Sequence, residues 1–93
     1  MKTVHMTVYG RVQGVGFRYF TQALALKMQV NGFVRNQSDG GVFIVAQASE
    51  EILQTFIEKI KASPSPYGAV YSTTVDLVLT EEQFTTFEIR YAD

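Results

Sequence analysis

The first residues of the chain alternate between apolar and polar side chains. Val4, Met6 and Val8 fall on one face of an extended segment, and the residues between them fall on the other. A repeat of two residues is typical of a strand with one buried face. The pattern therefore predicts a first strand over residues 4–9 that ends at Gly10.

A helical repeat replaces this alternation after Gly16. The predicted apolar stripe contains Phe17, Phe20, Leu24 and Met28, with Thr21, Gln22 and Lys27 outside it. Such spacing gives a helix one apolar face, which packs against a core. Asn31-Gly32 is predicted to stop the helix, because both residues tolerate a left-handed backbone.

Two short strands are predicted next, over residues 33–36 and 42–46. Between them lies Ser38-Asp39-Gly40-Gly41, a run of residues that favour turns. The simplest arrangement of two strands joined by so short a turn is an antiparallel hairpin.

A second amphipathic helix is predicted after Ser49. This serine is a suitable N-cap, and the acidic residues at 50 and 51 suit the positive end of a helix dipole. The apolar stripe contains Ile52, Phe56 and Ile60, flanked by Leu53 and Ile57. Residues 70–79 and the alternating residues 87–91 then predict two further strands.

The predicted order of elements is therefore βαββαββ. Two helices with one apolar stripe each are best buried side by side on one face of a mostly antiparallel sheet. This predicts an α+β sandwich in which the other sheet face stays open. A chain of 93 residues suffices for one such core, so we expect a single domain over residues 1–93.

Charge and composition narrow the range of partners. The formal net charge is −1, whereas domains that bind nucleic acids are usually strongly basic. There is no cysteine, which excludes disulfides, thiolate catalysis and zinc bound by thiolates. No apolar run is long enough to span a membrane or to act as a secretory signal, so we expect a cytoplasmic protein with no membrane partner.

Residues 10–18, Gly-Arg-Val-Gln-Gly-Val-Gly-Phe-Arg, connect the first strand directly to the first helix. Unpaired amides and the positive end of the helix dipole converge at such a position, and glycines allow the amides to point inward. Arg18 would lie in the first helical turn, where a cation is unfavourable unless an anion binds nearby. The loop therefore indicates an anion site. The alternative is that the glycines only permit a tight turn and that Arg18 is solvated.

The spacing within this loop argues against several kinds of phosphate site. Tyr19 stands where a dinucleotide fingerprint needs its third glycine, and no Gly-Lys-Ser/Thr sequence follows as a P-loop requires. Val12 lies six residues before Arg18, where a phosphatase with a cysteine nucleophile would carry that cysteine. Neither nucleotide binding nor a phosphoenzyme on this loop is expected.

The chain resembles the acylphosphatase family through residues 10–18, through Gly32-Phe33-Val34-Arg35-Asn36, and through Asp39-Gly40. The resemblance extends as far as residues 87–90 and implies a ferredoxin-like sandwich with a five-stranded sheet. It also implies an enzyme that hydrolyses carboxyl-phosphate bonds to a carboxylate and inorganic phosphate.

The same resemblance implies a role for each site residue. Arg18 and the backbone amides of residues 12–18 would hold the phosphate, and Asn36 would position the attacking water. The predicted phosphate-binding residues are Gln13, Gly14, Val15, Gly16, Phe17 and Arg18. Two departures from the family pattern affect loop shape rather than chemistry: Ala48, where a glycine commonly ends the third strand, and Ser63-Pro64-Ser65-Pro66, which replaces the usual Gly-Pro.

Some candidate residues also have simpler interpretations. Asn36 could have no role other than to start the turn that follows it. Arg35 is predicted on the opposite sheet face from Asn36, as a solvated or ion-paired residue, and His5 as a cross-strand partner rather than a phosphohistidine. The acidic residues are scattered, and the pairs at 50–51 and 81–82 are not arranged as metal ligands, so no metal or other cofactor is expected.

RNA binding is a competing hypothesis, because RNA-recognition modules use a similar sandwich and stack bases on aromatic residues of the open sheet face. Phe43 would lie on the third strand, but residues 42–47 lack the basic residue and the glycine of that signature. A third possibility is a module of the kind found at the start of larger maturation enzymes. We expect instead a complete, monomeric enzyme whose partners are an acyl phosphate and phosphate, without nucleic acid.

Overall fold

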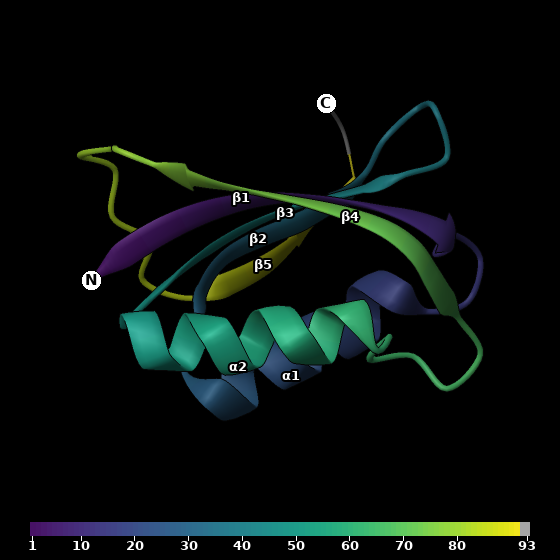
Figure 1. Ribbon diagram of the computed structural model, residues 1–93, viewed down its shortest axis with the longest axis horizontal. Helices are drawn as coiled ribbons and strands as arrows, with labels where there is room; N and C mark the ends of the chain where they lie inside the picture. The colour runs from purple at the N-terminus through teal and green to yellow at the C-terminus, as the bar shows by residue number, and fades with distance from the viewer. Residues whose placement is uncertain (92–93) are drawn as a thin grey trace.

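Two helices cover one face of a five-stranded sheet in the computed structural model, which describes residues 1–91 (Figure 1). In chain order the elements are β1 (Lys2–Arg11), α1 (Phe17–Met28), β2 (Asn31–Asn36), β3 (Val42–Ala48), α2 (Glu50–Lys61), β4 (Ala69–Val78) and β5 (Phe87–Arg90). The predicted order βαββαββ is confirmed. The last two residues of the expected domain lie outside the described residues.

The sheet has the strand order β4-β1-β3-β2-β5. β1 pairs antiparallel with β3 and with β4, and β2 pairs antiparallel with β3. The pairing of β2 with β5 is parallel, with Arg35 opposite Arg90. The sheet is therefore mixed but mostly antiparallel, and the parallel pair brings the C-terminal ends of β2 and β5 together.

The core lies between the helices and the sheet face that they cover. Val4, Met6 and Val8 of β1 are buried there, as their alternation predicts. Other buried apolar residues include Phe17, Val34, Val42, Ile44, Ala46, Leu53, Phe56, Ile60 and Phe87. Ser49 caps α2 by accepting a hydrogen bond from the amide of Ile52 at 3.4 Å, which confirms the predicted start of that helix.

The buried stripe of α1 differs from the predicted one. Thr21, predicted to lie outside the stripe, is fully buried together with Phe17 and Ala25, whereas Phe20 is only half-buried. Small side chains at two of these positions let the helix axis approach the sheet closely. In α2, Leu53 rather than Ile52 is fully buried.

The predicted end of α1 and several strand ends also need correction. Gln29, with φ of 60°, takes the left-handed conformation that ends the helix, so Asn31-Gly32 does not stop it. These two residues instead begin β2, because they pair with Gln47 and Ala46 of β3. β1 begins at residue 2 and continues past its predicted end to residue 11, and β3 continues to residue 48. β4 spans 69–78 rather than 70–79. β5 ends at residue 90, so Tyr91 lies just outside the last strand.

Both helices are short. Each contains twelve residues, and in the described part of the chain no helix combines the length and the apolar character needed to cross a membrane.

Candidate active site

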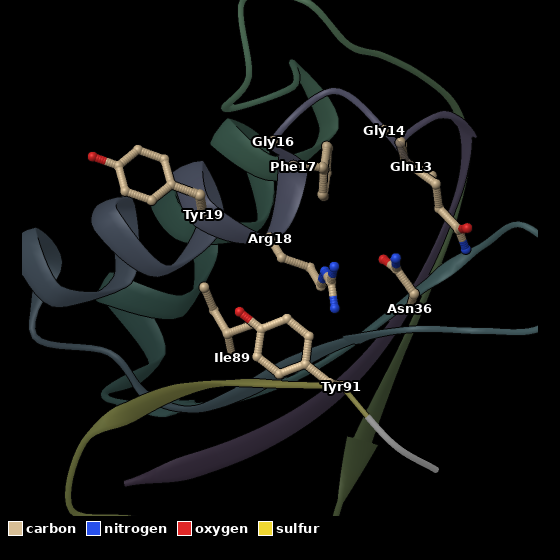
Figure 2. Close-up of a pocket in the computed structure, with 10 residues that line it drawn as sticks. Gln13, Gly14, Gly16, Phe17, Arg18, Tyr19, Asn36, Ile89 and Tyr91 are labelled. Carbon is tan, nitrogen blue, oxygen red and sulfur yellow. The ribbon is translucent and has the colours of Figure 1, made fainter.

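A pocket of about 190 Å³ opens where the loop between β1 and α1 meets the C-terminal ends of β2 and β5 (Figure 2). It is lined by Val12, Gln13, Gly14, Gly16, Phe17, Arg18, Tyr19, Asn36, Ile89 and Tyr91. The parallel pairing of β2 with β5 explains why residues so far apart in sequence converge here. The pocket has the size of a small polar group with its water rather than of an extended ligand.

The N-terminus of α1 borders this pocket, since Gly16, Phe17, Arg18 and Tyr19 all line it. Gly16 is the N-cap residue, with φ of 73°, and no side chain within residues 1–91 caps the helix. Gly14 also has a positive φ, 77°, so the two glycines curl the loop in a way that other residues rarely adopt. The first turn contains no acidic residue, whereas α2 begins with a serine cap and two glutamates. Within the described part of the chain, the amides of the first turn of α1 therefore lack the capping side chain and the acidic neighbours that α2 has, and they favour an anion.

Arg18 extends from this first turn into the pocket. Its Nη1 donates to the backbone carbonyl of Arg90 at 3.4 Å, and its Cζ lies 4.7 Å from the ring centroid of Tyr91. Within residues 1–91, no carboxylate forms an ion pair with Arg18. Figure 2 shows the guanidinium pointing toward Asn36 across the pocket. A half-buried cation held by β5 but not neutralised there is well suited to bind an anion.

Asn36, the last residue of β2, faces Arg18 from the other side. Its Oδ1 is buried, and within the described residues it has no hydrogen-bond partner. The turn that follows is closed by other groups: the amide of Gln37 donates to the carbonyl of Gly41 at 2.8 Å, and the carboxylate of Asp39 accepts from the amide of Gly41 at 3.0 Å. These two bonds, which close the turn, do not involve the Asn36 side chain. Its oxygen can therefore accept a hydrogen bond from a donor in the pocket.

Gln13 connects the loop to this turn. Its Nε2 donates to the carbonyls of Gln37 and Gly41, both at 2.8 Å. Both amide protons of the side chain are used in these contacts. Only the backbone of Gln13 can therefore contribute to an anion site.

A hydrogen-bond network on the outer side of the turn includes Tyr9 and Asp39. The phenol of Tyr9 donates to Asp39 Oδ2 at 2.8 Å. The backbone amide of Gly41, and after it this phenol, hold the pKa of the Asp39 carboxyl below its ordinary value. The bond to Asp39 raises the pKa of the Tyr9 phenol. Both groups thus keep the protonation states that preserve the turn at neutral pH.

Most of the predicted phosphate-binding residues line the pocket. Gln13, Gly14, Gly16, Phe17 and Arg18 do so, together with Asn36. Val15 is not among the lining residues: its side chain packs against the core, and its carbonyl accepts a hydrogen bond from Ser65. Sequence reasoning missed Tyr19, Ile89 and Tyr91. The alternation of apolar residues over 87–91 could have suggested Ile89 and Tyr91, but only the parallel pairing of β5 places them near Asn36.

The open sheet face holds His5 and Arg35, two of the residues for which simpler roles were predicted. His5 packs edge-on against Phe43, with ring centroids 5.2 Å apart, so the predicted cross-strand role is confirmed. The guanidinium of Arg35 lies 4.7 Å from the same ring centroid. Arg35 and Asn36 thus point to opposite faces, as predicted. Among residues 1–91, no three His, Asp or Glu side chains gather closely enough to hold a metal ion.

Comparison with known proteins identifies the family. The sequence model of the family described as Acylphosphatase matches residues 4–89. The chain belongs to the acylphosphatase family. The resemblance seen in residues 10–18 and 32–36 is therefore confirmed, and with it the prediction of a hydrolase of acyl phosphates.

Relatives with the name acylphosphatase match nearly the whole chain. The acylphosphatase of Lactobacillus gasseri is 50% identical over 91 residues, which cover 98% of this chain and 100% of that protein. The acylphosphatase of Enterococcus faecalis is 56% identical over 77 residues, 83% of this chain and 82% of that protein. The crystal structure of acylphosphatase from Bacillus subtilis has a TM-score of 0.93 at 42% identity, covering 98% of this chain and 100% of that chain. The ferredoxin-like α+β sandwich is thereby confirmed.

Proposed function

We propose that this chain hydrolyses acyl phosphates by direct attack of water on phosphorus, with Arg18 and the amides of residues 12–18 holding the phosphoryl group and Asn36 holding the water. The observation that carries the proposal is the buried Oδ1 of Asn36, which lacks a partner in the described chain and faces Arg18. A water molecule donating to this oxygen would lie beside a phosphoryl group bound to the guanidinium. This is the arrangement that an in-line attack requires.

The leaving group explains why so few residues suffice. The water oxygen forms a bond to phosphorus while the bond from phosphorus to the acyl oxygen breaks, releasing a carboxylate and inorganic phosphate. A carboxylic acid has a pKa of about 4, so the carboxylate departs without a proton from the enzyme. The proton of the water passes to a phosphate oxygen. Asn36 orients the water as a hydrogen-bond acceptor and does not remove the proton, because an amide is too weak a base.

Electrostatic stabilisation is the main contribution of the loop. Charge on the equatorial phosphate oxygens is met by Arg18, by the amides of the α1 N-terminus and by the positive end of the helix dipole. The bond from Arg18 to the Arg90 carbonyl and the contact with the Tyr91 ring hold the guanidinium in place before the substrate arrives. Such preorganisation removes the cost of ordering the cation during the reaction.

We further propose that the enzyme works as a cytoplasmic monomer, without a metal ion and without nucleic acid. The formal net charge of −1 gives the protein no overall attraction for a polyanion. The ring of Phe43, the aromatic residue suited to base stacking, already contacts His5 and Arg35 on the open face. A base would have to displace both side chains before stacking on this ring.

Hydrolysis of benzoyl phosphate in EDTA tests the proposal. Arg18→Ala is expected to lower kcat/KM by about 100-fold or more and to weaken inhibition by inorganic phosphate. Asn36→Ala is expected to lower kcat by about 100-fold while leaving the phosphate inhibition constant unchanged. Arg35→Ala is the matched control, because it removes a cation from the residue next to Asn36 on the opposite sheet face.

Two results would overturn these assignments. A folded native protein that is inert in EDTA but active with added metal would reject the metal-free reaction. An Asn36→Ala protein that weakens phosphate binding without losing turnover would make Asn36 a phosphate ligand rather than the residue that holds the water.

A further inference from the structure

Ser65 lies beneath the loop that carries the phosphate site, in the segment between α2 and β4. It is only 2% exposed. Its hydroxyl donates to the carbonyl of Val15 at 2.7 Å and accepts from the amide of Tyr67 at 3.2 Å. A distance of 2.7 Å is typical of a well-formed bond from a hydroxyl to an oxygen. The hydroxyl therefore has both a donor and an acceptor partner, and Val15 is bound from fifty residues away in sequence.

This bond sets the direction of one particular amide. The peptide between Val15 and Gly16 is trans, since the described chain has no cis peptide bond. In a trans peptide the C=O and the following N–H point in opposite directions. A Val15 carbonyl turned toward Ser65 therefore turns the N–H of Gly16 away from it. Gly16 lines the pocket and Val15 does not. In Figure 2 the green segment that joins α2 to β4 runs above the loop, whereas Arg18 and Asn36 lie below it.

The segment around Ser65 is built to be rigid. Pro64 and Pro66 restrict the backbone on both sides of it. Ser63 donates to the Ser65 carbonyl at 2.8 Å and has φ of 70°, a conformation that residues other than glycine rarely adopt. A Cβ on Gly68 would lie 2.8 Å from the Arg11 carbonyl and 3.3 Å from Val15, so the segment fits closely against the loop.

We propose that Ser65 is a positioning residue for the reaction: its hydroxyl fixes the Val15–Gly16 peptide so that the Gly16 amide points at the bound phosphoryl group. The inference rests on the proposed function, because it assumes that phosphate binds in this loop. The residue acts through Val15 and Gly16 and does not touch the substrate. The departure from the family pattern at residues 63–66 thus supplies a support for the site.

Inorganic phosphate, a product of the reaction, is the probe. In the native protein, saturating phosphate is expected to shift the ¹⁵N–¹H resonances of Gly14 and Gly16. Ser65→Ala is expected to abolish the Gly16 shift, to retain that of Gly14, and to raise the phosphate inhibition constant by about three- to tenfold, as for one lost hydrogen bond. Ser65→Thr, which keeps the hydroxyl, is expected to retain both the Gly16 response and the native constant.

The matched control is Ser63→Gly. It removes a hydroxyl from the same segment, preserves the positive φ, and leaves the bond to Val15 intact; it is expected to leave the Gly16 response unchanged. A Ser65→Ala protein that melts at a lower temperature but binds phosphate normally would reduce Ser65 to a structural role and overturn the inference. So would a folded Ser65→Thr protein that binds as weakly as Ser65→Ala. If the native protein shows no shift at either glycine, the phosphate site itself is wrong, which separates failure of the proposed function from failure of this inference.

Discussion

The side-chain amide of Gln13 donates to the backbone carbonyl of Gln37 at 2.8 Å, and thereby ties the loop before α1 to the turn after β2. The same nitrogen donates to the carbonyl of Gly41 at the other end of that turn. Gln37 follows Asn36 directly in the chain. One side chain therefore fixes the loop that carries the anion site relative to the strand end that carries the water-binding amide.

Replacing Gln13 should uncouple the two halves of the site. Gln13→Ala is expected to lower kcat/KM by about tenfold, because the phosphoryl group and the water lose their fixed separation. Gln13→Glu should be worse than Gln13→Ala, because a carboxylate cannot donate and would face two carbonyl oxygens. Steady-state kinetics with benzoyl phosphate measure both effects.

Gln22 provides the control for this comparison. Its Nε2 also donates to a backbone carbonyl, that of Phe87 at 3.0 Å, but it lies outside the pocket. Gln22→Ala is expected to retain kcat/KM. Equal activity of Gln13→Ala and the native protein would show that the loop and the turn keep their positions without this bridge.

The local parts of the site could be predicted from the sequence, and the long-range contacts could not. Gly14, Gly16 and Arg18 lie within five residues of one another, where turn chemistry and helix electrostatics act directly on the chain. The positions of Gln13 and Ser65 depend on side chains that reach segments 24 and 50 residues away. Alternation and helical repeats carry no information about such contacts.

The same distinction between local signals and long-range contacts explains the errors in the predicted fold. Asn31-Gly32 is a good stop signal, but Gln29 adopts the left-handed conformation first, and pairing with β3 then recruits Asn31 into a strand. Thr21 is polar by type, which predicts a position outside the stripe, yet it is buried because α1 packs closely against the sheet. Tertiary packing outweighs local preference at both positions.

The turn after β2 should respond to pH through Asp39. Its pKa is lowered in the folded protein by the amide of Gly41 and by the phenol of Tyr9. A depressed carboxyl pKa contributes stability that is present above the unfolded value near 3.8 and is lost as the pH falls through the folded value. Asp39→Asn is therefore expected to be less stable than the native protein at pH 7 and to lose this difference in strong acid.

Tyr9→Phe tests the cause of this shift. The phenol is lost while the Gly41 amide, the larger cause, remains, so the Asp39 pKa should rise only part of the way to its ordinary value. A titration of the Asp39 carboxyl carbon by NMR measures this pKa directly. The raised pKa of the Tyr9 phenol has the opposite consequence. The stability that it contributes to the folded protein is present below pH 10 and is lost as the pH rises through the pKa of the phenol in the folded protein. An Asp39 pKa that is unchanged in Tyr9→Phe would remove the phenol from the network.

Gln47 is expected to be one of the most sensitive polar positions for stability. It is 4% exposed and makes three bonds: Nε2 donates to Thr3 Oγ1 at 2.9 Å and to the Glu82 carbonyl at 3.0 Å, and Oε1 accepts from the amide of Phe84 at 3.0 Å. Gln47→Leu keeps much of the volume but leaves these partners unsatisfied, at a cost of about 2–4 kcal/mol in the free energy of unfolding. Urea unfolding measures it, with Gln22→Leu as a control that loses a single bond. A loss no larger than that of Gln22→Leu would contradict the prediction.

Removing the polar group of Thr21 should have the opposite effect and increase the free energy of unfolding. Its Oγ1 is buried in α1 and has no hydrogen-bond partner within residues 1–91, although a helical threonine commonly donates to the carbonyl four residues before it. Thr21→Val replaces the hydroxyl by a methyl group of similar size and removes an unsatisfied polar atom from the core. We expect the free energy of unfolding to rise by about 1 kcal/mol.

Thr21→Ala separates the two contributions in this substitution. It removes the hydroxyl as Thr21→Val does, but it also removes the buried methyl group, so its gain should be cancelled by about 1 kcal/mol of lost packing. The expected order of stability by urea unfolding is therefore Thr21→Val above the native protein and Thr21→Ala close to it. Activity should be retained in both variants, because Thr21 does not line the pocket. If Thr21→Val were less stable than the native protein, the Thr21 hydroxyl would have an acceptor in solution. The close packing of α1 against the sheet would then depend on a polar contact.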